Sequence, residues 1–139
     1  MQAAGKAQVS LEYLLLLAVL FGSFAMIAPK ILESYNAMVF ASDAQNAKAF
    51  CEKLSSTIEK TGFFENASSE RIKAFPELKW ILLASGSEVK IRVESKTLEK
   101  IKEVKCNSKV EVAEFEQSFT KAFSLRVQKA GGKVSIVNN

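Results

Sequence analysis

Glu12 is the residue of this chain that makes the clearest chemical demand on its surroundings. It is the only charged side chain between Val9 and Pro29, in a run that is otherwise apolar, small or uncharged. A charge at bilayer depth costs about 2.5–3.5 kcal/mol on insertion scales, so a carboxylate in such a run is expected to have a partner or a function. The first question is therefore which positive group faces this carboxylate.

Two answers fit the spacing of the residues around Glu12. If the chain is cut between Ala7 and Gln8, the new α-amino group of Gln8 lies four residues, or one helical turn, before Glu12. That amine could pair with Glu12 of its own chain or of a neighbour in a stack of parallel helices. Alternatively, Glu12 reaches the membrane interface at the start of the helix, close to the positive end of the helix dipole. The spacing alone leaves both answers open.

The apolar run around Glu12 is predicted to form a helix long enough to cross a membrane. A transmembrane helix needs about 20 mostly apolar residues, and Val9–Ile27 nearly meets that length. A secretory signal peptide has a shorter apolar stretch of about 7–15 residues. The run also continues into helical sequence without a loop. These features favour a plain membrane anchor, or a short cleavable leader placed before a helix that stays in the mature protein.

The stretch "GKAQVSLEYLLLL", Gly5 to Leu17, resembles the class III signal peptide of archaeal type IV pilin-like proteins. That family has a Gln-X-Ser-X-Glu core, preceded by a basic and a small residue and followed by a Leu-rich helix. The matching positions of this chain hold Lys6, Ala7, Gln8, Ser10 and Glu12. The resemblance implies that a prepilin peptidase cuts between Ala7 and Gln8, and that the leader Met1–Ala7 lies on the cytoplasmic side.

The same resemblance implies partners for the apolar helix. The pilus assembly machinery would draw subunits from the membrane, and copies of the chain would polymerise through this helix, with Gln8 and Glu12 at the contact. Three aromatic residues, Tyr13, Phe21 and Phe24, could interlock neighbouring helices, or they could face lipid. Small residues such as Ala18 and Gly22 allow helices to approach closely.

Helical periodicity continues beyond the apolar run, so we predict one helix from about Gln8 to Thr61. Apolar residues recur mostly at steps of three and four, as on one face of an α-helix. This face contains Ile31, Leu32, Tyr35, Met38, Val39, Ala47, Phe50, Cys51, Leu54 and Ile58. Pro29 is expected to kink or loosen the helix, and Gly62 to end it. The prediction divides the helix into a membrane or filament-core segment, residues 8–29, and an amphipathic continuation, residues 30–61.

After Gly62 the pattern changes to that of β-strands, in a head domain of residues 62–139. Residues 63–77 are predicted to be a loop that has room for one helical turn. "LKWILLAS" and "EVKIRVES" are predicted to pair as a hairpin around the Ser-Gly-Ser at 85–87. Further strands are expected from about Ile101, in "KVEVAEF", and in a second hairpin around "KAGG" at 129–132. This gives five to six antiparallel strands.

The predicted fold class is α+β. The long N-terminal helix is expected to pack its amphipathic second half against the apolar face of the antiparallel sheet. Cys51 falls on the apolar face of the helix and Cys106 at the end of a strand, so a disulfide between them would fasten helix to sheet. Two buried free thiols are the alternative. "NAS" at Asn66–Ser68 is a sequon for N-glycosylation, which is weak evidence alone because such triplets arise by chance.

Composition argues against several classes of function. The chain has no histidine, which removes the commonest general base and metal ligand. It has no Gly-rich phosphate loop and no nucleophile elbow, so we expect no enzyme, no cofactor and no metal site. Net charge is +4, but acidic and basic residues alternate, as on a solvated surface, so no nucleic-acid partner is predicted. The cluster Glu111, Glu114 and Glu116 also reads as a solvated face.

Two functions remain. The first is a structural pilin-like subunit that passes from the cytoplasmic membrane into an extracellular filament used for adhesion or surface attachment. The second is a membrane-anchored extracytoplasmic binding module that does not polymerise. The two differ at the leader, because only the first needs cleavage at Ala7–Gln8 and a paired Glu12.

Overall fold

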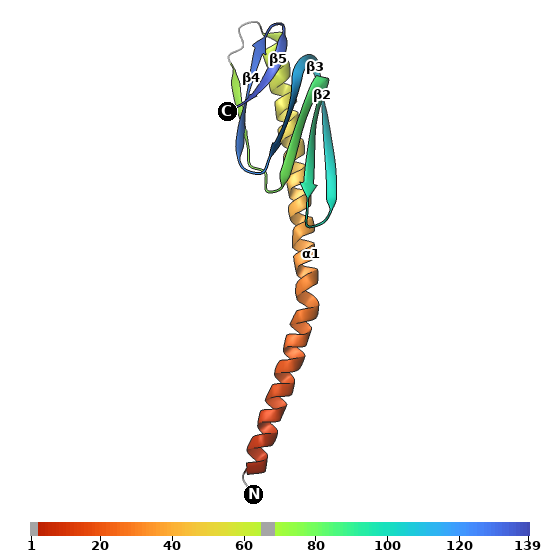
Figure 1. Cartoon of the computed structure of the whole chain (residues 1–139), viewed down its shortest axis with the longest axis vertical. Coiled ribbons are helices and arrows are strands. Elements are labelled where there is room, and N and C mark those ends of the chain that lie inside the picture. The colour runs from red at the N-terminus through yellow and green to blue at the C-terminus, as the bar shows by residue number, and fades with distance from the viewer. Residues whose placement is uncertain (1–2, 65–68) are drawn as a thin grey trace. The chain divides into compact units, whose positions relative to one another are not determined.

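One long helix and one β-sheet make up the part of the chain that the computed structural model describes, residues 3–64 and 69–139 (Figure 1). Helix α1 runs from Ala3 to Phe63. The strands are β1 (Glu70–Ala74), β2 (Lys79–Ser95), β3 (Lys100–Phe119), β4 (Phe123–Ala130) and β5 (Lys133–Asn138). The predicted α+β class, a long helix with a β-sheet on its second half, is confirmed. The chain divides after Asn36 into two compact units, and α1 contributes to both.

Helix α1 is longer at both ends than predicted. It begins at Ala3, before the predicted start at Gln8, in a stretch rich in alanine, the residue with the highest helix propensity. It continues through Pro29 and ends at Phe63. One uninterrupted helix is therefore present on both sides of Pro29, where a kink or a loosened turn was expected.

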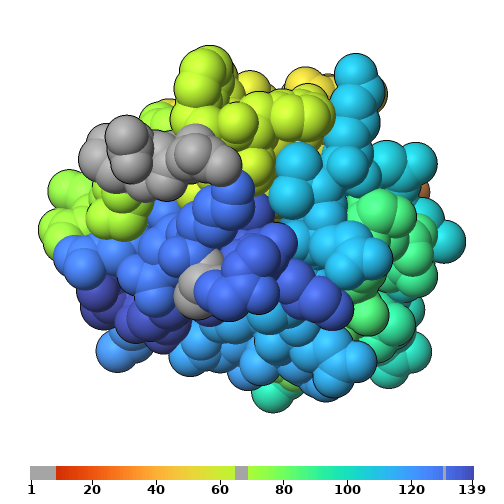
Figure 2. Space-filling view, turned by 90° about the horizontal axis from the view of Figure 1, so that it is seen from above, coloured from red at the N-terminus to blue at the C-terminus, as the bar shows by residue number. Residues whose placement is uncertain are grey.

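The core of the second unit lies between α1 and the sheet. The buried hydrophobic residues of the helix are Ala47, Phe50, Cys51, Leu54 and Ile58, all on the predicted apolar face. The sheet opposes them with alternate residues of each strand, among them Trp80, Leu82, Ile91, Leu125 and Val127. Burial of each such large side chain contributes about 1.5–3 kcal/mol. The space-filling view from above shows contact among three parts of this unit: the end of α1, the β4–β5 hairpin and the β2–β3 strands (Figure 2).

The sheet has the strand order β1-β4-β5-β3-β2 and is mixed rather than wholly antiparallel. The pairs β1–β4, β4–β5 and β2–β3 are antiparallel, whereas β3 and β5 are parallel, with Val112 opposite Val134. The reason is topological. The chain reverses after β3 and again after β4, so β5 runs in the direction of β3, and it inserts between β3 and β4. The hairpin predicted around Gly131 and Gly132 is present, and both glycines have positive φ.

The hairpin predicted around Ser85–Ser87 is wrong in its pairing. Residues 79–95 form one strand, β2, and its backbone partners lie in β3. The register shifts on both sides of Gly86, whose φ is +59°, and the β2–β3 ribbon folds over there (Figure 1). The fold brings the two ends of β2 together, because Lys79 Nζ lies 3.0 Å from Glu94 Oε2. The glycine signal therefore marked a real change of direction, but in a bulge of a paired ribbon.

Two further elements differ from the prediction. Residues 70–74 form the short edge strand β1 where a loop was expected. Gly62 does not end α1 but lets β3 approach it, because a Cβ at this position would lie 2.5 Å from Cγ1 of Val110. The carbonyl oxygen of Gly62 accepts a hydrogen bond from Lys129 Nζ at 3.2 Å, which satisfies one of the unpaired carbonyls of the last turn.

Asp43 fastens α1 to the beginning of β2. Its side chain is 1% exposed, and its two oxygens accept three hydrogen bonds. Oδ1 accepts from the backbone N–H of Glu77 at 3.2 Å, and Oδ2 accepts from the N–H of Leu78 at 3.0 Å and the indole N–H of Trp80 at 2.7 Å. A buried carboxylate is tolerated only when hydrogen bonds of this kind satisfy it. The same contact gives the buried indole its partner.

We predict that Asp43→Ala destabilises the second unit by about 3–5 kcal/mol, because it leaves three N–H groups without an acceptor. Asp43→Asn keeps the shape and one oxygen, so its cost should be smaller. The exposed acid Glu52, nine residues further along α1, provides the control, and Glu52→Ala should change stability by less than about 0.5 kcal/mol. Urea unfolding of the full chain in detergent, followed by Trp80 fluorescence, measures all three. Equal stability of the alanine variants at 43 and 52 would contradict the role of Asp43.

Candidate functional site

The first candidate site is the apolar part of α1, where every described side chain is exposed. The large apolar residues from Val9 to Ile27 have exposed fractions from 48% at Leu17 to 78% at Met26. These residues occur on all sides of the helix, and this segment is long and apolar enough to cross a membrane. A helix that is apolar all round is stable only when lipid or other helices cover it. Its sequence therefore specifies an environment that a single copy of the chain in water does not supply.

The three predicted assembly aromatics lie within this exposed segment. Tyr13 and Phe21 are each 66% exposed and Phe24 is 63% exposed. Steps of eight and three residues place the three rings on one side of the helix. The three exposed rings can contact a neighbouring helix or lipid, so both of the predicted roles stay open.

Polar and small groups in the segment do not interrupt it. Ser23 Oγ donates to the carbonyl oxygen of Val19 at 2.8 Å, so its hydroxyl is satisfied within the helix. A Cβ built on Gly22 would meet no atom within 4 Å, so the backbone is open to close approach at this position. The pair Gly22–Ser23 is therefore a place where another helix can come near without meeting an unpaired polar group.

The predicted processing residues all lie in α1. Lys6, Ala7 and Gln8 are in its first turns, and Ser10 and Glu12 follow in the same helix with exposed side chains. The helical backbone puts Gln8 and Glu12 one turn apart, as the sequence spacing predicts. The side chains of residues 3–8 are outside the described part of the structure, so only the backbone relation between these positions is established here.

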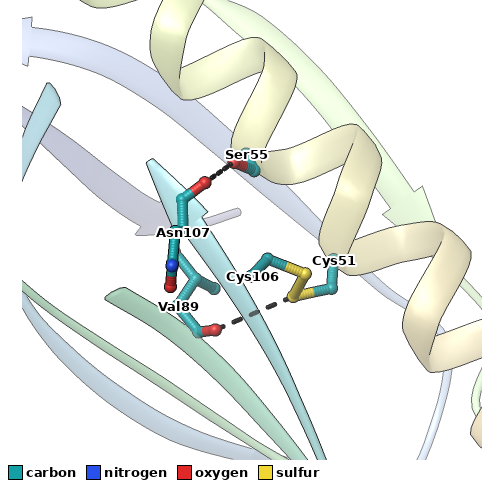
Figure 3. The surroundings of a disulfide bond; sticks show 5 residues. All are labelled: Cys51, Ser55, Val89, Cys106 and Asn107. Atoms are coloured by element: carbon teal, nitrogen blue, oxygen red, sulfur yellow. Dashed lines mark hydrogen bonds between the residues drawn. A yellow bond between two sulfur atoms is a disulfide. The ribbon is translucent and has the colours of Figure 1, made fainter. Parts of the chain in front are cut away.

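The second candidate site, the predicted disulfide, is present between Cys51 of α1 and Cys106 of β3 (Figure 3). The two Cα atoms are 6.0 Å apart, and the bond closes a sequence separation of 55 residues. Cys51 is fully buried, and its Sγ lies 3.8 Å from the carbonyl oxygen of Val89. Because a disulfide sulfur carries no proton, this last approach is a packing contact.

The disulfide is the first of three contacts on successive turns of α1. One turn on, Ser55 Oγ donates to the carbonyl oxygen of Asn107 at 2.7 Å (Figure 3). After a further turn, Glu59 Oε1 accepts from the N–H of Lys109 at 3.2 Å. The sequence analysis missed Ser55 and Glu59, although their spacing of four and eight residues from Cys51 was a usable signal. These three contacts, at Cys51, Ser55 and Glu59, form a row that fixes the register between α1 and β3.

The sequon asparagine, Asn66, lies outside the described residues, so the prediction of a glycosylation site there stays a prediction. No protein-family model, curated protein or solved structure matches this chain.

We predict that replacing both cysteines, Cys51→Ala with Cys106→Ala, lowers the free energy of unfolding by about 2–4 kcal/mol, since the bond closes a long loop of the unfolded chain. Urea unfolding of the full chain in detergent measures the change. A reducing agent should lower the stability of the unmodified chain by a similar amount and leave the double variant unaffected. If the double variant and the unmodified chain unfold at the same urea concentration, the bond does not contribute as proposed.

Proposed function

We propose that this chain is a structural pilin-like subunit. In this proposal a prepilin peptidase cuts it between Ala7 and Gln8 and the mature chain waits in the cytoplasmic membrane. Pilus assembly machinery then polymerises it through α1 into an extracellular filament for adhesion or surface attachment. One observation carries the proposal. A helix segment that is apolar and exposed on all sides precedes a head whose own core is closed by the second half of the same helix.

The exposed segment explains why a polymer is favoured. In the membrane, lipid covers the side chains from Val9 to Ile27. Outside the membrane this apolar surface must still be kept out of water. The same segment of other copies is equally apolar over its whole length, so packing against it covers the surface. The head needs no such cover, since its sheet already packs against residues 47–58 of α1.

Glu12 supports the same proposal. Packed among apolar helices, its carboxylate would be buried and would need a cation. The α-amino group released at Gln8 supplies one at a distance of one helical turn. In a plain membrane anchor, Glu12 lies near the interface, is hydrated and needs no such partner. The membrane-anchored binding module is therefore the alternative, and the fate of Gln8 and Glu12 separates it from the subunit.

The mature protein should begin at Gln8. N-terminal mass spectrometry of the protein isolated from the cells that make it, with sheared surface filaments analysed beside the membrane fraction, tests this expectation. An intact Met1, or a new terminus after Ala28, would contradict the processing step. Gln8 as the terminus in membranes, with no filament in the sheared fraction, would favour the anchored module.

Glu12→Ala and Glu12→Gln should each lower the yield of filaments by about tenfold or more, because an unpaired buried amine costs more than the 1.4 kcal/mol that corresponds to a factor of ten. Cleavage at Gln8 and the stability of the head should stay as in the unmodified chain. Glu33→Gln, at an exposed acid of α1 beyond the apolar run, is the matched control and should polymerise normally. Normal filaments from Glu12→Ala would refute the pairing.

A further inference from the structure

Two arginines converge on the outward face of the sheet, at a place that the proposed helix contacts do not use. Arg71 of β1 and Arg126 of β4 are direct cross-strand partners. Their neighbours Ile72, Leu125 and Val127 are fully buried against α1, so the two arginines project from the opposite face. Like charges opposite each other on paired strands are destabilising. This pair is therefore a local cost that the fold of one head does not explain.

One neutral oxygen joins the two guanidinium groups. In the amide orientation that satisfies the hydrogen bonds, Asn139 Oδ1 accepts from Arg71 Nε at 3.2 Å, from Arg71 Nη2 at 2.9 Å and from Arg126 Nη2 at 3.3 Å. Within residues 3–64 and 69–139, no carboxylate oxygen lies within ion-pair distance of either arginine. We call this pair the arginine clamp. An amide oxygen stands in it where an anionic oxygen would bind about twice as strongly.

The complementary charge lies on the same face, two strands away. Glu114 and Glu116 of β3 are exposed, and they flank Phe115, which packs into the core, so both carboxylates point outward. Among the described cations none is within ion-pair distance of either. Strand β5 separates them from the clamp, and at about 4.8 Å between strands the gap from β4 to β3 is roughly 10 Å. Within this head, no ion pair joins Glu114 or Glu116 to Arg71 or Arg126.

We propose that the arginine clamp of one subunit binds the carboxylates Glu114 and Glu116 of a second copy. The inference rests on the proposed function, because a polymer provides copies at high local concentration. It also fits the symmetry, since a filament is built from contacts between two different patches of identical subunits. Of the anionic partners that two guanidiniums could take, a second copy is favoured because this chain itself presents the matching carboxylates.

Charge reversal with compensation tests the contact in the full chain. The paired change Arg71→Glu with Arg126→Glu, and the paired change Glu114→Arg with Glu116→Arg, should each lower filament yield by about tenfold or more, as loss of a close interfacial charge pair does. All four changes in one chain should restore most of the yield. Lys96→Glu, at an exposed lysine in the β2–β3 turn, is the control and should polymerise normally. Filaments are measured by immunoblot of sheared material against the membrane fraction.

The fold of each variant is checked by formation of the Cys51–Cys106 bond and by urea unfolding, so loss of filaments from a folded subunit supports the contact. Normal filaments from either double variant would overturn the contact. A fourfold variant with a filament yield no higher than that of the poorer double variant would overturn it too. Both outcomes leave the proposed function intact. Normal filaments that lose adhesion to an acidic polysaccharide would assign the clamp to that ligand instead and also overturn the contact. No filaments from the unmodified chain would overturn the proposed function, and the contact with it.

Discussion

The structure depends on how the second half of α1 is held against the sheet. One face of the helix buries Ala47, Phe50, Leu54 and Ile58 under the strands, which supplies the apolar contact. Burial alone is non-directional and would allow the helix to slide or rotate. Directional contacts remove that freedom at two places, the hydrogen bonds of Asp43 near the beginning of β2 and the row of contacts along β3 that starts at Cys51. The polar groups therefore set the register of a core that apolar burial stabilises.

This arrangement separates two tasks along one helix. The residues after Asn36 belong to a head with its own core, whereas the described side chains before it, those of residues 9–35, are all exposed. The head could therefore fold on the outside of a membrane while the first half of α1 is still in lipid. It would then move from lipid to a polymer without rearrangement of the sheet. In the proposed subunit, only the surroundings of the apolar segment change between the two states.

Much of the fold could be predicted from the sequence because its signals are local. The helical repeat of apolar residues gave α1, alternation gave most of β2 to β5, and the burial expected of Cys51 gave the disulfide. Asp43 was missed because an acid in an amphipathic helix is usually solvated, and its partners at 77, 78 and 80 are distant in sequence. It nevertheless stands four residues before Ala47, on the buried face. The short strand β1 carries three charges in five residues and gave no apolar alternation to find.

The candidate sites were predictable to different degrees for the same reason. Gln8 and Glu12 are related by one turn of a helix, so their spacing is visible in the sequence. The convergence of Arg71 and Arg126 depends on pairing between β1 and β4, which only the fold reveals. The groups that Glu12 and the arginine clamp would bind in a polymer lie on other copies of the chain. A single chain specifies those contacts only through the charges and apolar surface that it leaves uncovered.

The disulfide has a mechanical consequence. A pulling force that enters through α1 and leaves through any residue after Cys106 passes through the Cys51–Cys106 bond. The intervening segment, residues 52–105, then carries no tension, and it contains the end of α1 together with all of β1 and β2. The chain between the two cysteines can be extended by that force only after the disulfide breaks. A load on a subunit fastened in this way would therefore lengthen the chain only before Cys51 and after Cys106, while the bond holds the ends of the segment between them together.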